Sequence, residues 1–414
     1  MFLGAHFGGN ANNSSNAGFT YANSNNSPAN TNANIGSHLY FFGNNINERA
    51  MTLPTWQKNS YNLFSVGRIN PKTLWIKSKK KRMKRFGNLY SRIISIENLE
   101  LADSRARKGK ANSYGVRFHD KNREQNIIEL NQTLLVGQYK TSKYDIFKIY
   151  EPKEREIYRL PYYPDRIVHH AIMNILEPIW ESVFTSDTYS CIKGRGIHGA
   201  MKAAKKAVQD ESVKYCLKID IIKFYPSIDH DILKMIIRKK IKCKDTLSLL
   251  DEIIDSAKGV PIGNYVSQYF ANLFLAYFDH WIKEDKGIKY YIRYADDMVF
   301  FSDNKPKLHK LLFDIDLYMD RLNLKVKDNY QIFPISKNSF DKSGRGIDFL
   351  GYVFYKDETR MRKSIKKNFK RTVYKMRNKN MSNKDYKQKI CSWIGWAKHC
   401  NANNLIKQTL NNKL

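Results

Sequence analysis

The sequence predicts an α+β fold in which helices and short strands are interleaved. From Met83 onward, apolar residues recur at the spacing of three and four that marks one face of a helix. Short apolar runs of strand length separate these helical stretches. Hydrophobic residues make up 42% of the 414 residues, enough for a sizeable core in about two or three packed units. The composition therefore excludes global disorder.

The region before residue 185 is expected to be mainly helical, with one pair of strands. Helical spacing covers residues 89–101 and 127–135, and another helix is expected over 167–184. Between the second and third of these helices, the pattern predicts two strands at residues 144–150 and 156–161.

After residue 214 the predicted elements alternate more closely. Helices are expected at four places, residues 231–240, 247–257, 265–284 and 308–322. Strands are expected at five places, residues 215–221, 289–294, 298–302, 331–334 and 346–355. A tight acidic turn joins the second and third of these strands, and a basic, mostly helical tail ends the sequence.

The charge balance points to a polyanionic partner, because 71 Lys and Arg face 39 Asp and Glu, a net charge of +32. No uncharged apolar run is long enough to span a membrane, and the start lacks the pattern of a secretory signal. We therefore expect a soluble, cytoplasmic protein with no membrane partner. The five cysteines have no short paired spacing, which argues against a disulfide framework and a cysteine-rich zinc site.

Residues 1–82 form a compositionally separate extension. The first 47 residues contain 13 asparagines, and no Lys, Arg, Asp or Glu precedes Glu48. The extension then becomes basic, but it holds only nine positive charges and one negative charge, so most of the surplus belongs to the remainder of the chain. A disordered polar arm is one interpretation of this composition.

Three aspartates are the strongest candidates for catalysis. Asp220 ends an apolar strand, and Asp296 and Asp297 lie between two strands. Taken singly, each motif is typical of a turn or a helix cap. Together they suit phosphoryl transfer, which uses two Mg²⁺ ions about 3.5–4 Å apart. Mg²⁺ prefers oxygen ligands, and carboxylates from neighbouring strands supply them. Grouped carboxylates repel one another, and a bound cation keeps them ionised.

The motifs around these aspartates resemble the palm of reverse transcriptases. The sequence reads LKIDIIKFYPSID at residues 217–229, GVPIGNYVSQ at 259–268 and YADD at 294–297. The likeness extends from about Met83 to the C-terminus and includes RLPYYPDR at 159–166, CIKGRGIH at 191–198 and GIDFLG at 346–351. The resemblance implies a right-hand polymerase that copies RNA into DNA. Residues 83–143 would then be the helical part of the fingers, 144–355 the fingers and palm, and 356–414 a helical basic thumb.

The resemblance also implies roles for single residues. Asp220, Asp296 and Asp297 would be catalytic and would bind the two Mg²⁺ ions, with the backbone carbonyl of Ile221 as a further ligand. Tyr225 matches the bulky gate that favours deoxynucleotides, although ordinary palm packing is the alternative for this residue.

The resemblance also implies that six further positions bind substrate. Arg155 and Arg159 lie in the fingers strand that supplies triphosphate-binding cations in such enzymes, although either could be a plain surface charge. The segment containing Ile262, Gly263, Asn264 and Gln268 matches the one that contacts template and incoming nucleotide.

This segment departs from the common pattern of the family. Most relatives have Gln-Gly followed by Ser-Pro, whereas this chain has Ile262-Gly263 followed by Ser267-Gln268. The variation resembles reverse transcriptases of diversity-generating retroelements, which copy a template-repeat RNA with errors at adenines and deliver the cDNA to a variable gene. An amide can hydrogen-bond beside the nascent base pair, whereas isoleucine supplies only shape, and packing alone discriminates by about 1–3 kcal/mol. We therefore expect the enzyme to select less strictly at the nascent base pair.

The Asn-rich extension resembles the end of the lectin-like variable proteins that those elements diversify. Changing either adenine of an asparagine codon yields many residues and never a stop codon. We hypothesise that residues 1–82 are the template repeat and its flank read in frame, with the functional protein beginning near Met83.

The expected partners are template RNA, cDNA and dNTPs, with a small basic accessory variability protein implied by the resemblance. Two alternatives remain. One is a retron, group II intron-like or phage-defence reverse transcriptase, and the other is a catalytically idle RNA-binding protein that retains the fold.

Overall fold

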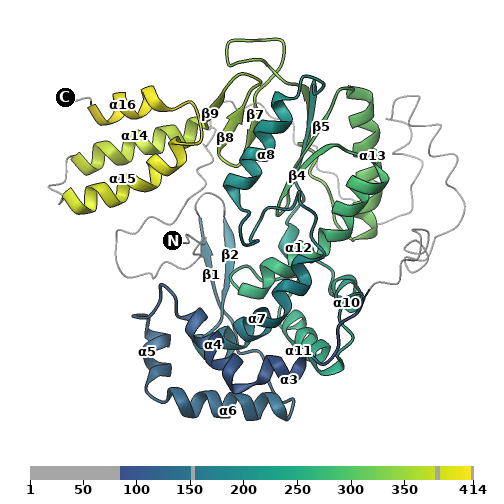
Figure 1. The fold of residues 1–414 in the computed structure, drawn as a ribbon, viewed down its shortest axis with the longest axis vertical. Helices are drawn as coiled ribbons and strands as arrows, with labels where there is room; N and C mark the ends of the chain where they lie inside the picture. The colour runs from purple at the N-terminus through teal and green to yellow at the C-terminus, as the bar shows by residue number, and fades with distance from the viewer. Residues whose placement is uncertain (1–83, 151–153, 378–382, 412–414) are drawn as a thin grey trace, which may run out of the picture. The chain divides into compact units, whose positions relative to one another are not determined.

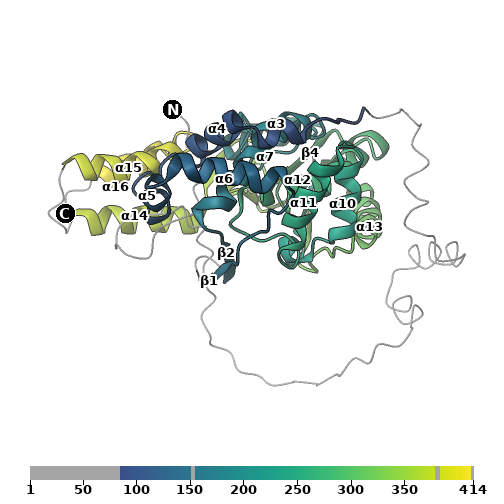
Figure 2. The ribbon, with the colours of Figure 1, turned by 90° about the horizontal axis from the view of Figure 1, so that it is seen from below.

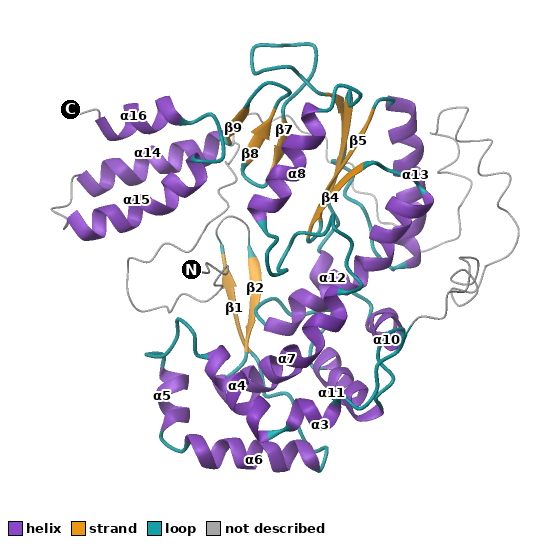
Figure 3. Cartoon of the chain, in the orientation of Figure 1, coloured by secondary structure: helices purple, strands orange, loops and turns teal. Residues whose placement is uncertain are grey.

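The computed structural model describes residues 84–150, 154–377 and 383–411, and Figure 1 shows how their helices and strands are arranged. These residues belong to one unit of the chain. The predictions made for residues 1–82 lie outside the described residues. Antiparallel sheets are interleaved with helices along the described chain, which confirms the predicted α+β class (Figure 3).

The first helices are more numerous than the sequence predicts. They are α3 (Tyr90–Ile94), α4 (Ile96–Ala106), α5 (Tyr114–Asp120) and α6 (Arg123–Leu135). The single helix expected over residues 89–101 is wrong, because Ser95 leaves the helical conformation with ψ at 145°. Its hydroxyl accepts a hydrogen bond from Asn98 N and caps α4.

The predicted strand pair is confirmed as an antiparallel hairpin. Strand β1 (Asp145–Ile149) pairs with β2 (Arg155–Arg159), with Asp145 opposite Arg159. A π-helical turn, η2 (Tyr162–Arg166), follows, and then α7 (Ile167–Glu181), which packs against α4. Figure 2 shows the hairpin projecting away from α4 and α6.

A four-stranded antiparallel sheet forms the centre of the described structure, in the order β4-β5-β3-β6. Its strands are β3 (Tyr215–Ile219), β4 (Tyr290–Tyr294), β5 (Asp297–Ser302) and β6 (Gln331–Pro334). All four lie within or beside strands that the sequence predicts.

The two faces of this sheet belong to different hydrophobic clusters because side chains alternate along each strand. Leu217 and Phe300 point to the cluster that contains α12 (Tyr265–His280) and α13 (Lys305–Arg321). Cys216 and Val299 point to the cluster that contains α8 (Ile197–Gln209), a helix that the sequence analysis missed.

Apart from α9 (Phe224–Ser227), which the sequence does not predict, the remaining helices before the C-terminal part lie close to their predicted positions. Helices α9, α10 (His230–Arg238) and α11 (Lys244–Asp255) follow β3. Helix α12 ends earlier than expected, because the chain changes to the π-helical turn η3 (Trp281–Asp285).

The C-terminal part combines a small sheet with three helices. Its elements are β7 (Ile347–Phe349), β8 (Tyr352–Phe354), β9 (Thr359–Met361), α14 (Lys363–Arg377), α15 (Asn383–Ala397) and α16 (Asn403–Asn411). The single strand predicted over residues 346–355 is wrong, because Leu350 and Gly351 have positive φ and turn the chain between β7 and β8. Trp396 stacks on Tyr352 with ring centres 5.2 Å apart, which joins α15 to this sheet.

Among the described residues, no helix combines the length and apolar character needed to cross a bilayer. All five cysteines are described, and none forms a disulfide.

Candidate active site

The β4–β5 hairpin carries two of the three candidate aspartates. Tyr294 pairs with Asp297, so Ala295 and Asp296 form the turn between the strands. Ala295 has a φ of 55°, in the left-handed region that tight turns between strands require. The turn therefore holds Asp296 at its tip and Asp297 at the start of β5.

Strand β3 brings the third aspartate to the same edge of the sheet. Ile219, its last residue, lies opposite Met298 of β5. Asp220 follows Ile219 and Asp297 precedes Met298, so both lie at the same end of the sheet. The structure thus brings together the three aspartates that the sequence predicts.

The pKa values of Asp296 and Asp297 are raised because both carboxyls are buried close to other charged groups. Burial, the charge of Asp220 and a side-chain hydrogen bond with Asp220 together raise the pKa of Asp296 to about 7. Burial also raises the pKa of Asp297 to about 6, with the charge of Lys218 opposing the rise. Carboxyls in such an arrangement share protons until a cation neutralises them.

Two lysines lie against the carboxylates, and the sequence analysis missed both. The Lys327 ammonium forms an ion pair with Asp220, and its backbone N–H donates to the Asp220 carbonyl at 2.9 Å. Lys218 Nζ lies 3.7 Å from Asp297 Oδ1 and donates to the Asp348 carbonyl at 2.6 Å. The Lys327 contact arises because residues 325–327 pair with 220–222, which no local sequence pattern reveals.

The donor set fits a divalent cation. Asp297 Oδ1 is buried and has no hydrogen-bond partner in the described part of the chain. The backbone of Ile221 faces Val326, but the two hydrogen bonds of this bridge use Asp220 and Ile222, so they leave the Ile221 carbonyl unused. Within the described ranges, no three His, Cys, Asp or Glu side chains are already arranged as a metal-ligand group. Ligation by all three aspartates therefore requires side-chain adjustment.

Tyr225 lies beside this edge of the sheet. It is the second residue of α9, and Asp296 contributes to the raised pKa of its phenol, for which burial is the main cause. Its carbonyl accepts a hydrogen bond from Val260 N at 2.9 Å. Gly259, with a φ of 62°, fits here because a Cβ would lie 2.5 Å from that carbonyl.

The segment that begins at Gly259 also contacts the β1–β2 hairpin. The Ile262 carbonyl accepts a hydrogen bond from Tyr158 N at 2.8 Å. Gly263 has a φ of 124°, and a Cβ there would lie 2.6 Å from the Tyr158 carbonyl. Asn264 is buried and donates to the Tyr144 hydroxyl at 3.0 Å. The structure thus places these three predicted residues between β2 and α12, while Gln268 lies half-buried within the first turns of α12.

Arg155 and Arg159 are exposed at the two ends of β2. Arg159 forms an ion pair with Asp145 and lies 5.6 Å over the ring of Phe147. No hydrogen bond or ion pair joins either arginine to the three aspartates within the described residues, so the structure does not bring these two predicted residues to the carboxylates.

Residues 151–354 match the family model described as reverse transcriptase (RNA-dependent DNA polymerase). This part of the chain therefore belongs to the reverse transcriptase superfamily. The match and the mixed architecture are consistent with the right-hand polymerase fold that the sequence resemblance implies.

Individual relatives align over limited regions. The chain is 27% identical to Protein YkfC of Escherichia coli over 172 residues, 37% of this chain and 45% of that protein. It is 24% identical to the group II intron-encoded protein LtrA of Lactococcus lactis over 176 residues, 39% of this chain and 29% of that protein. The chain thus spans less than half the length of these curated relatives. Among solved structures, it resembles apo telomerase from Candida tropicalis with 12% identity and a TM-score of 0.42, over 54% of this chain and 55% of that one.

Proposed function

We propose that this protein is an RNA-directed DNA polymerase. The observation that carries the proposal is the convergence of Asp220, Asp296 and Asp297 at one edge of the central sheet, inside the region that matches reverse transcriptases. In this proposal, residues 83–143 and 144–355 form the fingers and palm, and residues 356–414 form the thumb.

Two Mg²⁺ ions would bind at this edge, with Asp220 and Asp296 as principal ligands and Asp297 and the Ile221 carbonyl beside them. Bound Mg²⁺ supplies charge neutralisation and an activated primer hydroxyl. The carboxylates orient the reacting groups, and Lys327 keeps Asp220 neutralised until a cation displaces it.

The surrounding residues would bind the nucleotide and template. Tyr225, beside Asp296, would clash with a ribose 2′-hydroxyl and so favour dNTPs. Ile262, Gly263, Asn264 and Gln268 would form the wall behind the nascent base pair. Arg155 and Arg159 would contact the triphosphate, which requires Arg159 to leave Asp145 and the β1–β2 hairpin to approach the carboxylates.

Template RNA and cDNA would be held mainly through phosphates, as the net charge of +32 suggests. Helix α14 supports this proposal, because its buried face is apolar and its other positions include no acidic residue. Its cations are Lys363, Lys366, Lys367, Lys370, Arg371, Lys375 and Arg377.

We further propose that the enzyme belongs to a diversity-generating retroelement. It would copy a template-repeat RNA in the cytoplasm with errors at adenines, together with a small basic accessory protein. Support comes from Ile262 and Gln268, which depart from the common amide and proline, and from the Asn-rich composition of residues 1–47. A second candidate is a group II intron-like reverse transcriptase, which the similarity to LtrA favours.

Primer extension by the full chain on template-repeat RNA, with Mg²⁺ and dNTPs, tests these proposals. The accessory protein is supplied in a parallel reaction, and the cDNA is sequenced. Errors concentrated opposite template adenines would support the retroelement proposal, whereas accurate copying would favour the group II intron-like candidate. Absence of any product in both reactions would contradict polymerase function.

A further inference from the structure

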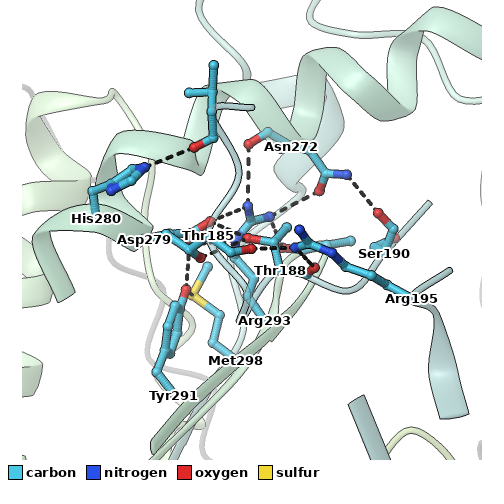
Figure 4. A network of polar contacts seen from close by, with 12 residues as sticks. Thr185, Thr188, Ser190, Arg195, Asn272, Asp279, His280, Tyr291, Arg293 and Met298 are labelled. Carbon is cyan, nitrogen blue, oxygen red and sulfur yellow. Dashed lines mark hydrogen bonds and ion pairs between the residues drawn. The ribbon is translucent and has the colours of Figure 1, made fainter. Parts of the chain in front are cut away.

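Arg293 directly precedes the YADD sequence and lies completely buried at the end of β4. Its Nε and Nη2 atoms donate to Asp279 of α12 at 2.7 and 2.6 Å, and both side chains are 0% exposed (Figure 4). A buried ion pair is a poor source of stability, because desolvation of the two charges offsets their attraction. The role of Arg293 is therefore better explained by what its other hydrogen bonds hold in place than by the stability of the ion pair.

The same guanidinium reaches the turn that carries Asp296. Its Nη1 atom donates to the carbonyl of Ala295 at 3.2 Å. Ala295 is the left-handed residue of the turn, and Asp296 is the next residue. One side chain thus links the body of α12 to the backbone that holds Asp296.

Asn272 extends this link to a second point on α12, about two helical turns before Asp279. Its Oδ1 accepts from Arg293 Nη1 at 3.2 Å, and its carbonyl accepts from Nη2 at 3.3 Å. The Asn272 side chain also donates to the Ser190 carbonyl at 2.7 Å (Figure 4). Arg293 therefore meets α12 at two points, Asn272 and Asp279, and its planar fork is held in one orientation.

The backbone of Arg293 is fixed as well. Its N–H donates to the Asp187 carbonyl at 2.9 Å, and its carbonyl accepts from Tyr189 N at 3.0 Å. Between them, Thr188 Oγ1 donates to Asp279 Oδ2 at 2.8 Å. The end of β4 is thus bonded on one side to residues 187–189 and on the other to β5.

We infer that Arg293 is a positioning residue that sets the place of Asp296 relative to Asp220 by holding the Ala295 carbonyl against α12. This inference rests on the proposed function, because Asp296 is taken as a metal ligand. Removing a group that hydrogen-bonds to and orients a metal ligand typically lowers metal affinity by about 10–100-fold.

The test compares Arg293→Lys with Tyr291→Phe in the full chain. Lysine keeps a positive charge opposite Asp279, but its single ammonium cannot bond Asp279, Asn272 and Ala295 together. Tyr291→Phe removes the 2.8 Å bond from Tyr291 Oη to Asp279 Oδ1, which belongs to the same buried network but does not touch the turn. Both variants are expected to lower Tm. Asn272→Ala is a third variant, which removes one bond to Arg293 and leaves the ion pair intact.

The decisive readout is Mn²⁺ affinity without nucleic acid, measured by electron paramagnetic resonance of free Mn²⁺. We expect Arg293→Lys to weaken Mn²⁺ binding by about tenfold, Asn272→Ala to weaken it less, and Tyr291→Phe to leave it within about twofold of wild type. Equal affinities in all three variants would overturn the inference, whatever their Tm values. The Mg²⁺ concentration that half-saturates dNTP incorporation should rise most in Arg293→Lys, less in Asn272→Ala and least in Tyr291→Phe.

The two proposals fail in distinguishable ways. Suppose that wild type makes no DNA but binds Mn²⁺, and that Asp296→Asn abolishes this binding. The polymerase proposal then fails, while the Mn²⁺ affinities of the three variants still test the role of Arg293. If wild type makes DNA and Arg293→Lys binds Mn²⁺ as wild type does, the polymerase proposal stands and the positioning role fails.

Discussion

Lys327 and Asp220 are joined twice, once through backbone atoms and once through side chains. The Lys327 N–H donates to the Asp220 carbonyl at 2.9 Å, and the Lys327 ammonium pairs with the Asp220 carboxylate. A cation of the protein therefore compensates one member of the carboxylate group. Divalent metal binding would have to replace this compensation.

Lys327→Gln should make the protein without metal slightly less stable and more responsive to Mg²⁺. The pair is about one-third exposed, so we expect a loss below about 1 kcal/mol in the free energy of unfolding in EDTA. The rise in Tm on adding Mg²⁺ should be larger than in wild type, because no ammonium competes for Asp220. Lys325→Gln is the matched control, and an identical Mg²⁺ response in both variants would contradict the prediction.

The stability of the protein without metal should depend on pH through Asp296 and Asp297. Their folded pKa values, about 7 and about 6, lie above the ordinary value of 3.8. A carboxyl with a raised folded pKa contributes its full stabilisation below its unfolded pKa, and this contribution is lost as the pH rises from there through the folded pKa.

In EDTA we therefore expect Tm to fall as the pH rises from the ordinary carboxyl pKa of 3.8 to about 7, and the stabilisation by Mg²⁺ to grow over the same window. Thermal unfolding at a series of pH values, with EDTA or Mg²⁺, measures both effects. Asp296→Asn should remove most of the dependence. A Tm that rises through this window in wild type, with the variant unchanged, would refute the assignment.

Much of the central fold could be predicted because its signals are local. The strand that precedes Asp220 and the strands on either side of Asp296 each show an apolar run bounded by acidic or turn residues. Ser95 could not be identified as a helix break, because the apolar spacing continues through it and only its backbone conformation and side-chain cap show that α4 begins there. The end of α12 at His280 was missed for the same reason.

The sequence predicts the carboxylates of the candidate site but not the lysines that lie against them. Asp220, Asp296 and Asp297 lie in short motifs whose order and spacing can be recognised along the chain. Lys327 and Lys218 acquire their contacts from pairing between distant segments, which leaves no spacing signal. The buried position of Arg293 likewise depends on α12 and on residues 187–189, so its side chain could not be distinguished from an ordinary strand arginine.

Gly263→Ala should displace the segment that faces the β1–β2 hairpin. The added Cβ would lie 2.6 Å from the Tyr158 carbonyl at a φ that disfavours a side chain. We expect the KM for dNTP to rise while far-UV circular dichroism stays like that of wild type. Gly137→Ala is the control, because it has a φ of 69° with nothing near its Cβ. Equal kinetic effects in both variants would show that backbone strain alone is responsible.

Tyr225→Ala should relax the choice between deoxynucleotides and ribonucleotides. The ring lies beside Asp296, and loss of its bulk should lower discrimination by at least about tenfold, the usual effect of shape in a binding pocket. Single-nucleotide incorporation of dNTP and rNTP measures the ratio. Tyr225→Phe keeps the ring and should retain wild-type discrimination, whereas equal loss in both variants would assign the effect to the hydroxyl.

Neutralising exposed cations of α14 should weaken nucleic-acid binding in a salt-dependent way. Lys367→Gln and Lys370→Gln together should reduce the steepness of the log–log salt dependence by about 0.7–0.9 for each lost phosphate contact. Fluorescence anisotropy with an RNA–DNA duplex measures this slope. Lys307→Gln with Lys310→Gln on α13 is a control of equal charge, and a similar change there would mean that only net charge matters.

Incorporation of a single dNTP on an RNA template in Mg²⁺ is the sharpest test of catalysis by the three aspartates of the candidate site, with wild type, Asp296→Asn and the exposed control Asp328→Asn compared in the full chain. If Asp296 is a catalytic metal ligand, wild type and Asp328→Asn extend the primer and Asp296→Asn does not. Extension by Asp296→Asn at the wild-type rate would refute this role for Asp296.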